Sequence, residues 1–141
     1  MISPVLLDTG PLVAFLNRQD DAHEWAVARF KEIEAPFLTC EAVLSETIHL
    51  LQGRAVVLEH LEKFLVAGFI RAEFSFAEEV VAVTRLLRTY RDVPMSLADG
   101  CLVRMSELHP RAVVFTLDTD FRIYRKHGRQ AIPVLLPPGK A

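Results

Sequence analysis

Two aspartates each follow a short apolar segment, at positions where an α/β protein often carries its chemistry. Asp8 comes directly after the run Val5–Leu7, and Asp118 comes directly after the run 112–117. If both runs are strands of a parallel sheet, both carboxylates lie at its carboxyl edge, where ligands bind in such sheets. Each residue also has a simpler interpretation, because Asp is common in turns and at helix caps.

Two further acids lie in expected helices. Glu46 is in the middle of one helix, and its neighbours one turn away are Ala, Val and Leu. A carboxylate on a partly apolar stripe is costly unless it is paired or binds a metal, although a solvated or salt-bridged rim position is the alternative. Asp99 stands three residues after Ser96, a spacing that resembles a capping box and gives Asp99 a structural alternative as well.

Taken together, the four acids predict a cation site. Carboxylates that lie close together repel one another unless a cation neutralises them. Hard oxygen ligands select Mg²⁺ or Mn²⁺ rather than zinc. Such an ion can activate water for attack on a phosphodiester and stabilise the leaving oxygen.

The elements needed to position these acids alternate along the chain. Continuous apolar strands separated by helices predict a parallel sheet covered on both faces, in a three-layer α/β/α domain formed by residues 1–141. The expected strands are 5–7, 36–39, 69–74, 112–117 and 132–136. The expected helices are 11–16, 22–33, 41–52, 55–67, 77–90, 96–108 and 123–127.

Composition limits the function classes without naming one. The net charge is −2, so a nucleic-acid partner would need a local basic patch. The five histidines are scattered without a zinc-binding spacing, and the two cysteines are expected to be free thiols of a cytoplasmic protein. The N-terminal segment lacks the features of a signal peptide, and no apolar run reaches membrane-spanning length.

Four segments resemble the PIN domains, and in particular the VapC-like toxin ribonucleases. The segments are VLLDTGPLVAFLN, CEAVLSETIHLL, PMSLADGCLVRMSE and VVFTLDTDFRIYR, and they occur in the family's order and at about its spacing. The resemblance implies a Rossmann-like fold, a divalent-metal acidic site and endoribonuclease activity that leaves a 5′ phosphate and a 3′ hydroxyl. It also implies a homodimer and an antitoxin protein as partner.

The resemblance carries over to individual residues. It implies that Asp8, Asp99 and Asp118 hold Mg²⁺ or Mn²⁺, and that Glu46 positions or deprotonates the attacking water or binds a second ion. Whether Asp118 or Asp120 faces the metal stays open, with Asp120 as an alternate ligand. Thr116 matches a hydroxyl position beside the site.

Basic residues after Asp118 are candidates for substrate contacts. Arg122, Arg125 and Lys126 are the candidate phosphate contacts, and a solvated helix face is the alternative. Arg104 lies five residues after Asp99 and is a candidate to neutralise the site, whereas the arginines of the helix at 77–90 are interpreted as surface residues.

Two other functions compete with the metal-dependent ribonuclease. One is a PIN-like nucleic-acid-binding module without catalytic activity, which the intact set of four acids disfavours. The other is a Mg²⁺-dependent hydrolase of small phosphate esters. It ranks last because the sequence lacks a DxDxT motif and a GxxxxGK[ST] loop.

Overall fold

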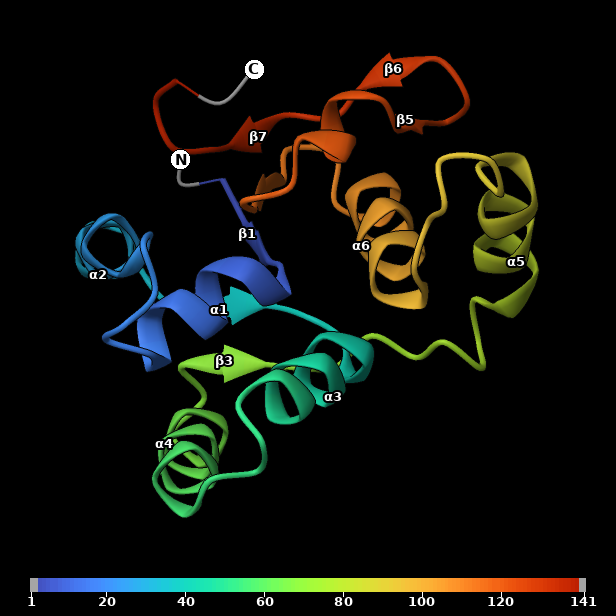
Figure 1. Cartoon of the computed structure of the whole chain (residues 1–141). Helices are drawn as coiled ribbons and strands as arrows, with labels where there is room; N and C mark the ends of the chain where they lie inside the picture. The colour runs from blue at the N-terminus through green and yellow to red at the C-terminus, as the bar shows by residue number, and fades with distance from the viewer. Residues whose placement is uncertain (1–2, 140–141) are drawn as a thin grey trace.

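A computed structural model describes residues 3–139 and contains a five-stranded sheet in which every pairing is parallel. The strand order is β3-β2-β1-β4-β7, which places β1 and β4 next to each other at the centre (Figure 1). The predicted parallel sheet is therefore confirmed. Its strands are β1 (Val5–Leu7), β2 (Phe37–Leu38), β3 (Ile70–Arg71), β4 (Val113–Phe115) and β7 (Val134–Leu135).

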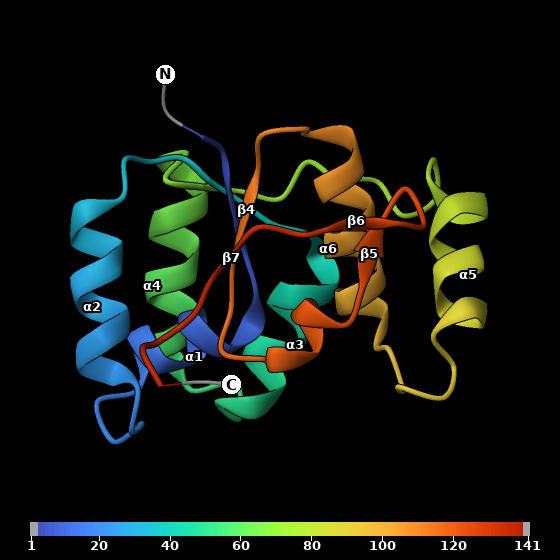
Figure 2. The ribbon, with the colours of Figure 1, turned by 90° about the horizontal axis from the view of Figure 1, so that it is seen from above.

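Helices cover both faces of this sheet. In Figures 1 and 2, α2 and α4 lie on one side, and α3 and α6 lie on the other with α5 outermost. This arrangement confirms the three-layer α/β/α prediction. The helices are α1 (Thr9–Leu16), α2 (His23–Glu32), α3 (Glu41–Leu50), α4 (Ala55–Val66), α5 (Val80–Thr89) and α6 (Leu97–Leu108). Within residues 3–139, no helix has the length and apolar character needed to cross a membrane.

The core that fixes the sheet against α2 is aromatic. The ring of Phe30 on α2 lies 4.7 Å from Phe37 of β2 and 5.3 Å from Phe115 of β4, measured between centroids. Both strand residues are fully buried, as is Leu6 of β1. Each such side chain contributes about 1.5–3 kcal/mol through burial, which holds the central strands rigidly in register.

The register of the central strands sets the position of the acids. Leu7 of β1 pairs with Phe115 of β4, and the Asp8 amide extends this ladder by donating to the Phe115 carbonyl at 3.0 Å. Asp8 and Thr116 therefore leave the sheet side by side at its carboxyl edge. This edge lies near α1 and α3 and is the lower edge of the sheet in Figure 2.

The chain after Asp118 differs from the prediction of a short helix at 123–127. A 3-10 helix, η1 (Thr119–Arg122), comes first, followed by an antiparallel hairpin of β5 (Arg125–Lys126) and β6 (Gln130–Ala131). His127 and Gly128 turn the hairpin with φ angles of 54° and 76°, which a right-handed helix does not allow. The predicted helix was therefore wrong.

Several other boundaries also moved. Helix α1 begins at Thr9 rather than Pro11, because a proline is tolerated throughout the first turn, where the amide has no partner within the helix. The strand expected at 69–74 is reduced to Ile70–Arg71. The helix expected from residue 77 begins at Val80, after a turn over 76–79.

Candidate active site

An open groove of about 650 Å³ lies at the carboxyl edge of the sheet. All four predicted acids line it, although they come from four separate parts of the chain. Asp8 follows β1, and Asp118 follows β4. Glu46 lies in α3, and Asp99 lies in the first turn of α6. The lining residues are Asp8, Thr9, Gly10, Val13, Asp20, Glu46, Leu50, Ser96, Asp99, Leu117, Asp118 and Thr119.

Asp8 is a helix cap and a buried groove acid at the same time. Its Oδ1 accepts a hydrogen bond from the Thr9 amide at 2.8 Å, and its Oδ2 accepts one from the Thr116 hydroxyl at 2.7 Å. Burial raises the pKa of Asp8 to about 7, although these two hydrogen bonds lower it, and the charges of Asp99 and Asp118 raise it further. The carboxylate is therefore held in one orientation at a considerable electrostatic cost.

Glu46 reaches the groove from α3 and contacts the residue after Asp8. The Thr9 hydroxyl donates to Glu46 Oε1 at 2.7 Å. Among the described residues, no basic side chain forms an ion pair with Glu46, so the salt-bridged alternative does not hold. The sequence interpretation missed Thr9, and a hydroxyl directly after a strand-end acid was the available signal.

Asp99 forms the capping box that its spacing indicates, and it also lines the groove. The Ser96 hydroxyl accepts a hydrogen bond from the Asp99 amide at 3.0 Å, and Asp99 Oδ2 accepts one from the Ser96 amide at 3.3 Å. The Tyr124 hydroxyl donates to the same Oδ2 at 3.0 Å. Among residues 3–139, both hydrogen bonds that the Asp99 carboxylate accepts use Oδ2. Burial is the main cause that raises the pKa of Asp99, to which the charge of Asp118 adds.

Tyr124 is a second residue that the sequence interpretation missed. Its side chain is fully buried, and a buried tyrosine hydroxyl normally has a hydrogen-bond partner. Here that partner is a groove acid. Burial, followed by the nearby Asp99 charge, raises the pKa of Tyr124 far above its usual range. Tyr124 therefore remains a neutral donor to Asp99 and links the segment after η1 to α6.

Of the two aspartates after β4, Asp118 lines the groove and Asp120 does not. Asp118 Oδ1 accepts a hydrogen bond from the Asp120 amide at 2.9 Å. The Thr116 hydroxyl accepts from the Asp118 amide at 2.9 Å while it donates to Asp8. Thr116 thus orients the Asp8 carboxylate and fixes the backbone of Asp118, and its hydroxyl lies beside the site, at the position that the resemblance indicates.

Asp20 is a fifth acid in the groove that the sequence interpretation did not include. It lies in the loop between α1 and α2, and its Oδ1 accepts a hydrogen bond from the Ala22 amide at 2.9 Å. Its position depends on how α1 packs, and no local pattern indicated that it would reach the other acids.

The donor set of the groove fits a hard divalent cation. Every ionisable side chain that lines the groove within the described chain is a carboxylate, so no lysine, arginine or histidine there compensates the acids. Within residues 3–139, however, no three acids converge closely enough to hold an ion directly. A bound Mg²⁺ would therefore be held partly through water, which this ion commonly retains.

The predicted phosphate contacts lie outside the groove. Arg122 is exposed, and Arg125 donates from Nη1 to the carbonyls of Arg122 and Tyr124 at 2.7 and 3.1 Å. Lys126 is buried, and its Nζ donates to the Pro110 carbonyl at 3.1 Å.

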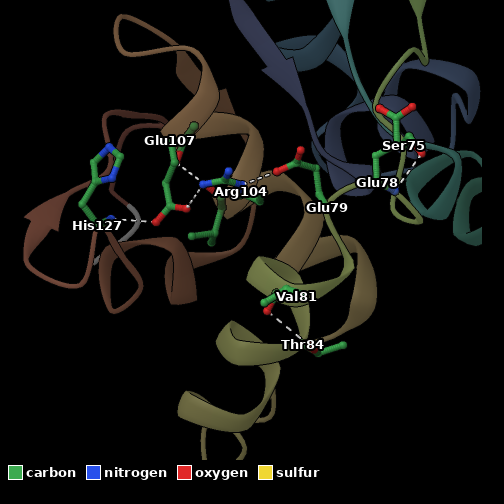
Figure 3. Close-up of polar contacts among 10 residues, drawn as sticks. Ser75, Glu78, Glu79, Val81, Thr84, Arg104, Glu107 and His127 are labelled. Atoms are coloured by element: carbon green, nitrogen blue, oxygen red, sulfur yellow. Dashed lines mark hydrogen bonds and ion pairs between the residues drawn. The ribbon is translucent and has the colours of Figure 1, made fainter.

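Arg104 also does not reach the groove acids, so the expectation that it neutralises the site is wrong. Its guanidinium instead binds Glu79 and Glu107, at 2.6 and 3.0 Å (Figure 3).

The parallel sheet and the groove at its carboxyl edge define an α/β protein with a cluster of carboxylates at the ends of its central strands. The PIN-domain family model matches residues 5–126, a segment that contains all four acids. The chain therefore belongs to the PIN-domain family. PIN domains are generally nucleases and are often metal-dependent. A search of curated proteins gave no significant match to the chain.

Proposed function

We propose that this protein is an Mg²⁺- or Mn²⁺-dependent endoribonuclease that hydrolyses RNA phosphodiester bonds. One observation carries the proposal: four acids from separate elements line one groove, and within the described chain no basic side chain lines it. Such a cluster costs stability unless a cation binds, and proteins maintain such a cost mainly at functional sites.

In this proposal Asp8, Asp99 and Asp118 hold the ion, in part through water. When bound there, such an ion would act as a Lewis acid that polarises the phosphate and stabilises the leaving oxygen. The Thr116 hydroxyl fixes the orientation of the Asp8 carboxylate and the position of the Asp118 backbone. The third ligand is oriented by its capping box and by Tyr124.

Glu46 positions the attacking water and accepts its proton. The Thr9 hydroxyl occupies Oε1, which leaves Oε2 without a hydrogen-bond partner among the described residues. Thr9 itself is buried at the start of α1. Its hydroxyl therefore fixes the carboxylate of Glu46 relative to Asp8. A fixed position suits a general base, which must lie within hydrogen-bond reach of the proton that it accepts.

The proposal extends to the protein's partners. We infer that the protein is the toxin of a VapBC-like toxin–antitoxin pair and forms a homodimer, as the resemblance to VapC-like ribonucleases implies. An antitoxin segment with a basic side chain would neutralise the groove acids. Exposed apolar side chains on α3 and α4 support a protein interface, with Ile48, Leu50, Val56, Leu58, Leu65 and Val66 as its members. Sedimentation velocity of the purified protein tests the dimer.

A cleavage assay tests the function. Labelled RNA, labelled DNA and a small phosphate ester are incubated with the protein in Mg²⁺, Mn²⁺ or EDTA. RNA cleavage should require the metal, and Glu46→Gln should reduce the rate by about 10²–10⁴-fold. Asp8→Asn should abolish cleavage, whereas Asp92→Asn, which removes an exposed carboxylate outside the groove, should not.

Two results would contradict the proposal. Cleavage that continues in EDTA, or that persists in Asp8→Asn, would show that the activity does not depend on a metal ion held by the groove acids. Tight RNA binding without cleavage in any metal would favour the alternative of a nucleic-acid-binding module.

A further inference from the structure

Arginines that lie far apart in the sequence line one pocket on the outer side of α6. The pocket has a volume of about 470 Å³ and is bounded by α5, α6 and the β5–β6 hairpin. The sequence interpretation assigned the arginines of α5 to the surface and those of the hairpin segment to the substrate. The structure brings one member of each group, Arg85 and Arg125, together in a pocket that shares no lining residue with the acidic groove. Its polar lining residues include Arg85, Tyr90, Arg104, Glu107, Arg125 and His127.

An ion-pair network includes two residues that line this pocket, Arg104 and Glu107. Arg104 donates from Nε to Glu79 Oε1 at 2.6 Å and from Nη1 to Glu107 Oε1 at 3.0 Å. Glu107 Oε2 accepts a hydrogen bond from the His127 amide at 2.7 Å (Figure 3). The charge of Arg104 is therefore compensated, and the network fixes the hairpin turn to α6 and to the start of α5.

Two other arginines in the pocket keep an uncompensated charge. Arg125 donates only to main-chain carbonyls, and within residues 3–139 neither Arg125 nor Arg85 forms an ion pair with an acid. The exposed His127 lies beside them. Among the described residues, Glu107 is the one acid that lines the pocket, and it shares Arg104 with Glu79, so this network carries a net charge of −1. Arg85 and Arg125 together carry a charge of +2, so the pocket as a whole keeps a positive charge.

A pair of tyrosines connects the pocket to the acidic groove. The Tyr90 hydroxyl in the pocket accepts a hydrogen bond from the Arg125 amide at 2.9 Å. Its ring packs edge-on against Tyr124 with the centroids 5.1 Å apart. Tyr124 in turn donates to Asp99 in the groove. A continuous chain of contacts through these two tyrosines therefore joins the cationic pocket to a candidate metal ligand.

We propose that this pocket binds phosphate groups of the RNA strand on one side of the cleavage position. Guanidinium groups match phosphate oxygens in geometry and charge. A protein with a net charge of −2 needs such a local patch to hold a polyanion whose reacting phosphate enters an acidic groove. The inference rests on the proposed ribonuclease function and adds the site that holds the strand.

RNA binding measured without catalysis tests the pocket. The affinity of the full-length protein for a labelled single-stranded RNA is measured in EDTA over a series of salt concentrations. Each phosphate contact on a single strand contributes about 0.7 to the slope of log K against log salt. Arg85→Gln should lower the slope by about that amount and weaken binding about threefold at moderate salt. Arg125→Gln should act in the same direction.

Arg88→Gln provides the matched control. Arg88 is exposed on the same helix, α5, but does not line the pocket. For Arg88→Gln, the slope of log K against log salt should equal that of the wild type. Thermal melting of all variants identifies any loss of affinity that comes from unfolding. This check matters most for Arg125, because its side chain also binds two carbonyls of its own segment.

The outcomes separate this inference from the proposed function. The proposal that the pocket binds phosphates would be wrong if Arg85→Gln kept the wild-type slope of log K against log salt. It would also be wrong if Arg88→Gln lowered that slope as much as Arg85→Gln does. Either result would count against the pocket even if the protein cleaves RNA. If Arg85→Gln lowers this slope and Arg88→Gln does not, the result supports phosphate binding in the pocket, even if the protein cleaves no RNA with any metal. With an active enzyme, Arg85→Gln should raise KM for a long RNA and leave cleavage of a dinucleotide unchanged.

Discussion

Replacing Asp8 with asparagine should stabilise the metal-free protein at alkaline pH. Burial raises the pKa of Asp8 from 3.8 to about 7. Because the pKa is higher in the folded state, the folded protein binds the extra proton between these two values. The free energy of unfolding therefore falls as the pH rises through this range. The difference of about three pKa units corresponds to about 4 kcal/mol.

Urea unfolding in EDTA at about pH 4.5 and about pH 8.5 measures this effect. Asparagine keeps an oxygen that can accept from the Thr9 amide but cannot ionise. Between about pH 4.5 and about pH 8.5, the free energy of unfolding of the wild type should fall by about 3–4 kcal/mol more than that of Asp8→Asn. Asp20→Asn is the control, because Asp20 lines the same groove but is partly exposed, so solvent screens its charge.

An equal pH dependence in the wild type and Asp8→Asn would refute the argument from burial. A divalent ion adds a second readout at about pH 8.5. Since a ligand that binds only the folded state stabilises it, Mg²⁺ or Mn²⁺ should raise the melting temperature of the wild type. Asp8→Asn should lose most of this increase, whereas Asp20→Asn should retain it.

Two further substitutions test contacts around the groove and the pocket. Tyr124→Phe removes the hydroxyl that donates to Asp99 and should weaken Mn²⁺ binding about tenfold, measured by calorimetry, as loss of a hydrogen bond to a metal ligand typically does. Tyr90→Phe removes a hydroxyl of the same aromatic pair that does not contact an acid, and its Mn²⁺ affinity should not change. Arg104→Gln should lower the free energy of unfolding by about 1 kcal/mol in urea, because its ion pairs are partly exposed, and high salt should reduce the difference.

The sequence was sufficient to predict the acids at strand ends. Asp8 and Asp118 each follow a continuous apolar run, and parallel strands bring their carboxyl ends to one edge of the sheet. The capping spacing of Asp99 was also visible locally, and the structure contains both the cap and the groove position. The interpretation of Asp99 as a groove acid and its interpretation as a capping residue are therefore compatible, because a capping residue can also project into a cleft.

The contacts that orient these acids could not be predicted from local pattern. The bond between Thr9 and Glu46 joins residues 37 positions apart, and Tyr124 meets Asp99 across 25 positions. Both depend on how α1, α3 and α6 pack at the sheet edge. Glu46 was identified because its helical neighbours are apolar, but its partner was not.

The arginines show a second limit of local reasoning. Arg104 is close to Asp99 in sequence, yet it extends to Glu79 and Glu107. The hairpin after η1 was missed because the left-handed backbone at the turn is not evident from a run of basic residues. That hairpin is the element that places Arg125 opposite α5.

The most direct test of the proposed metal site is to locate a bound divalent ion in the crystal. Crystals grown with Mn²⁺ and measured near the manganese absorption edge would give an anomalous difference map. We expect a peak in the groove between Asp8, Asp99 and Asp118, and no such peak in Asp8→Asn. Saturating Mn²⁺ that gives no peak in the groove, or a peak only elsewhere on the protein, would contradict the proposed metal site.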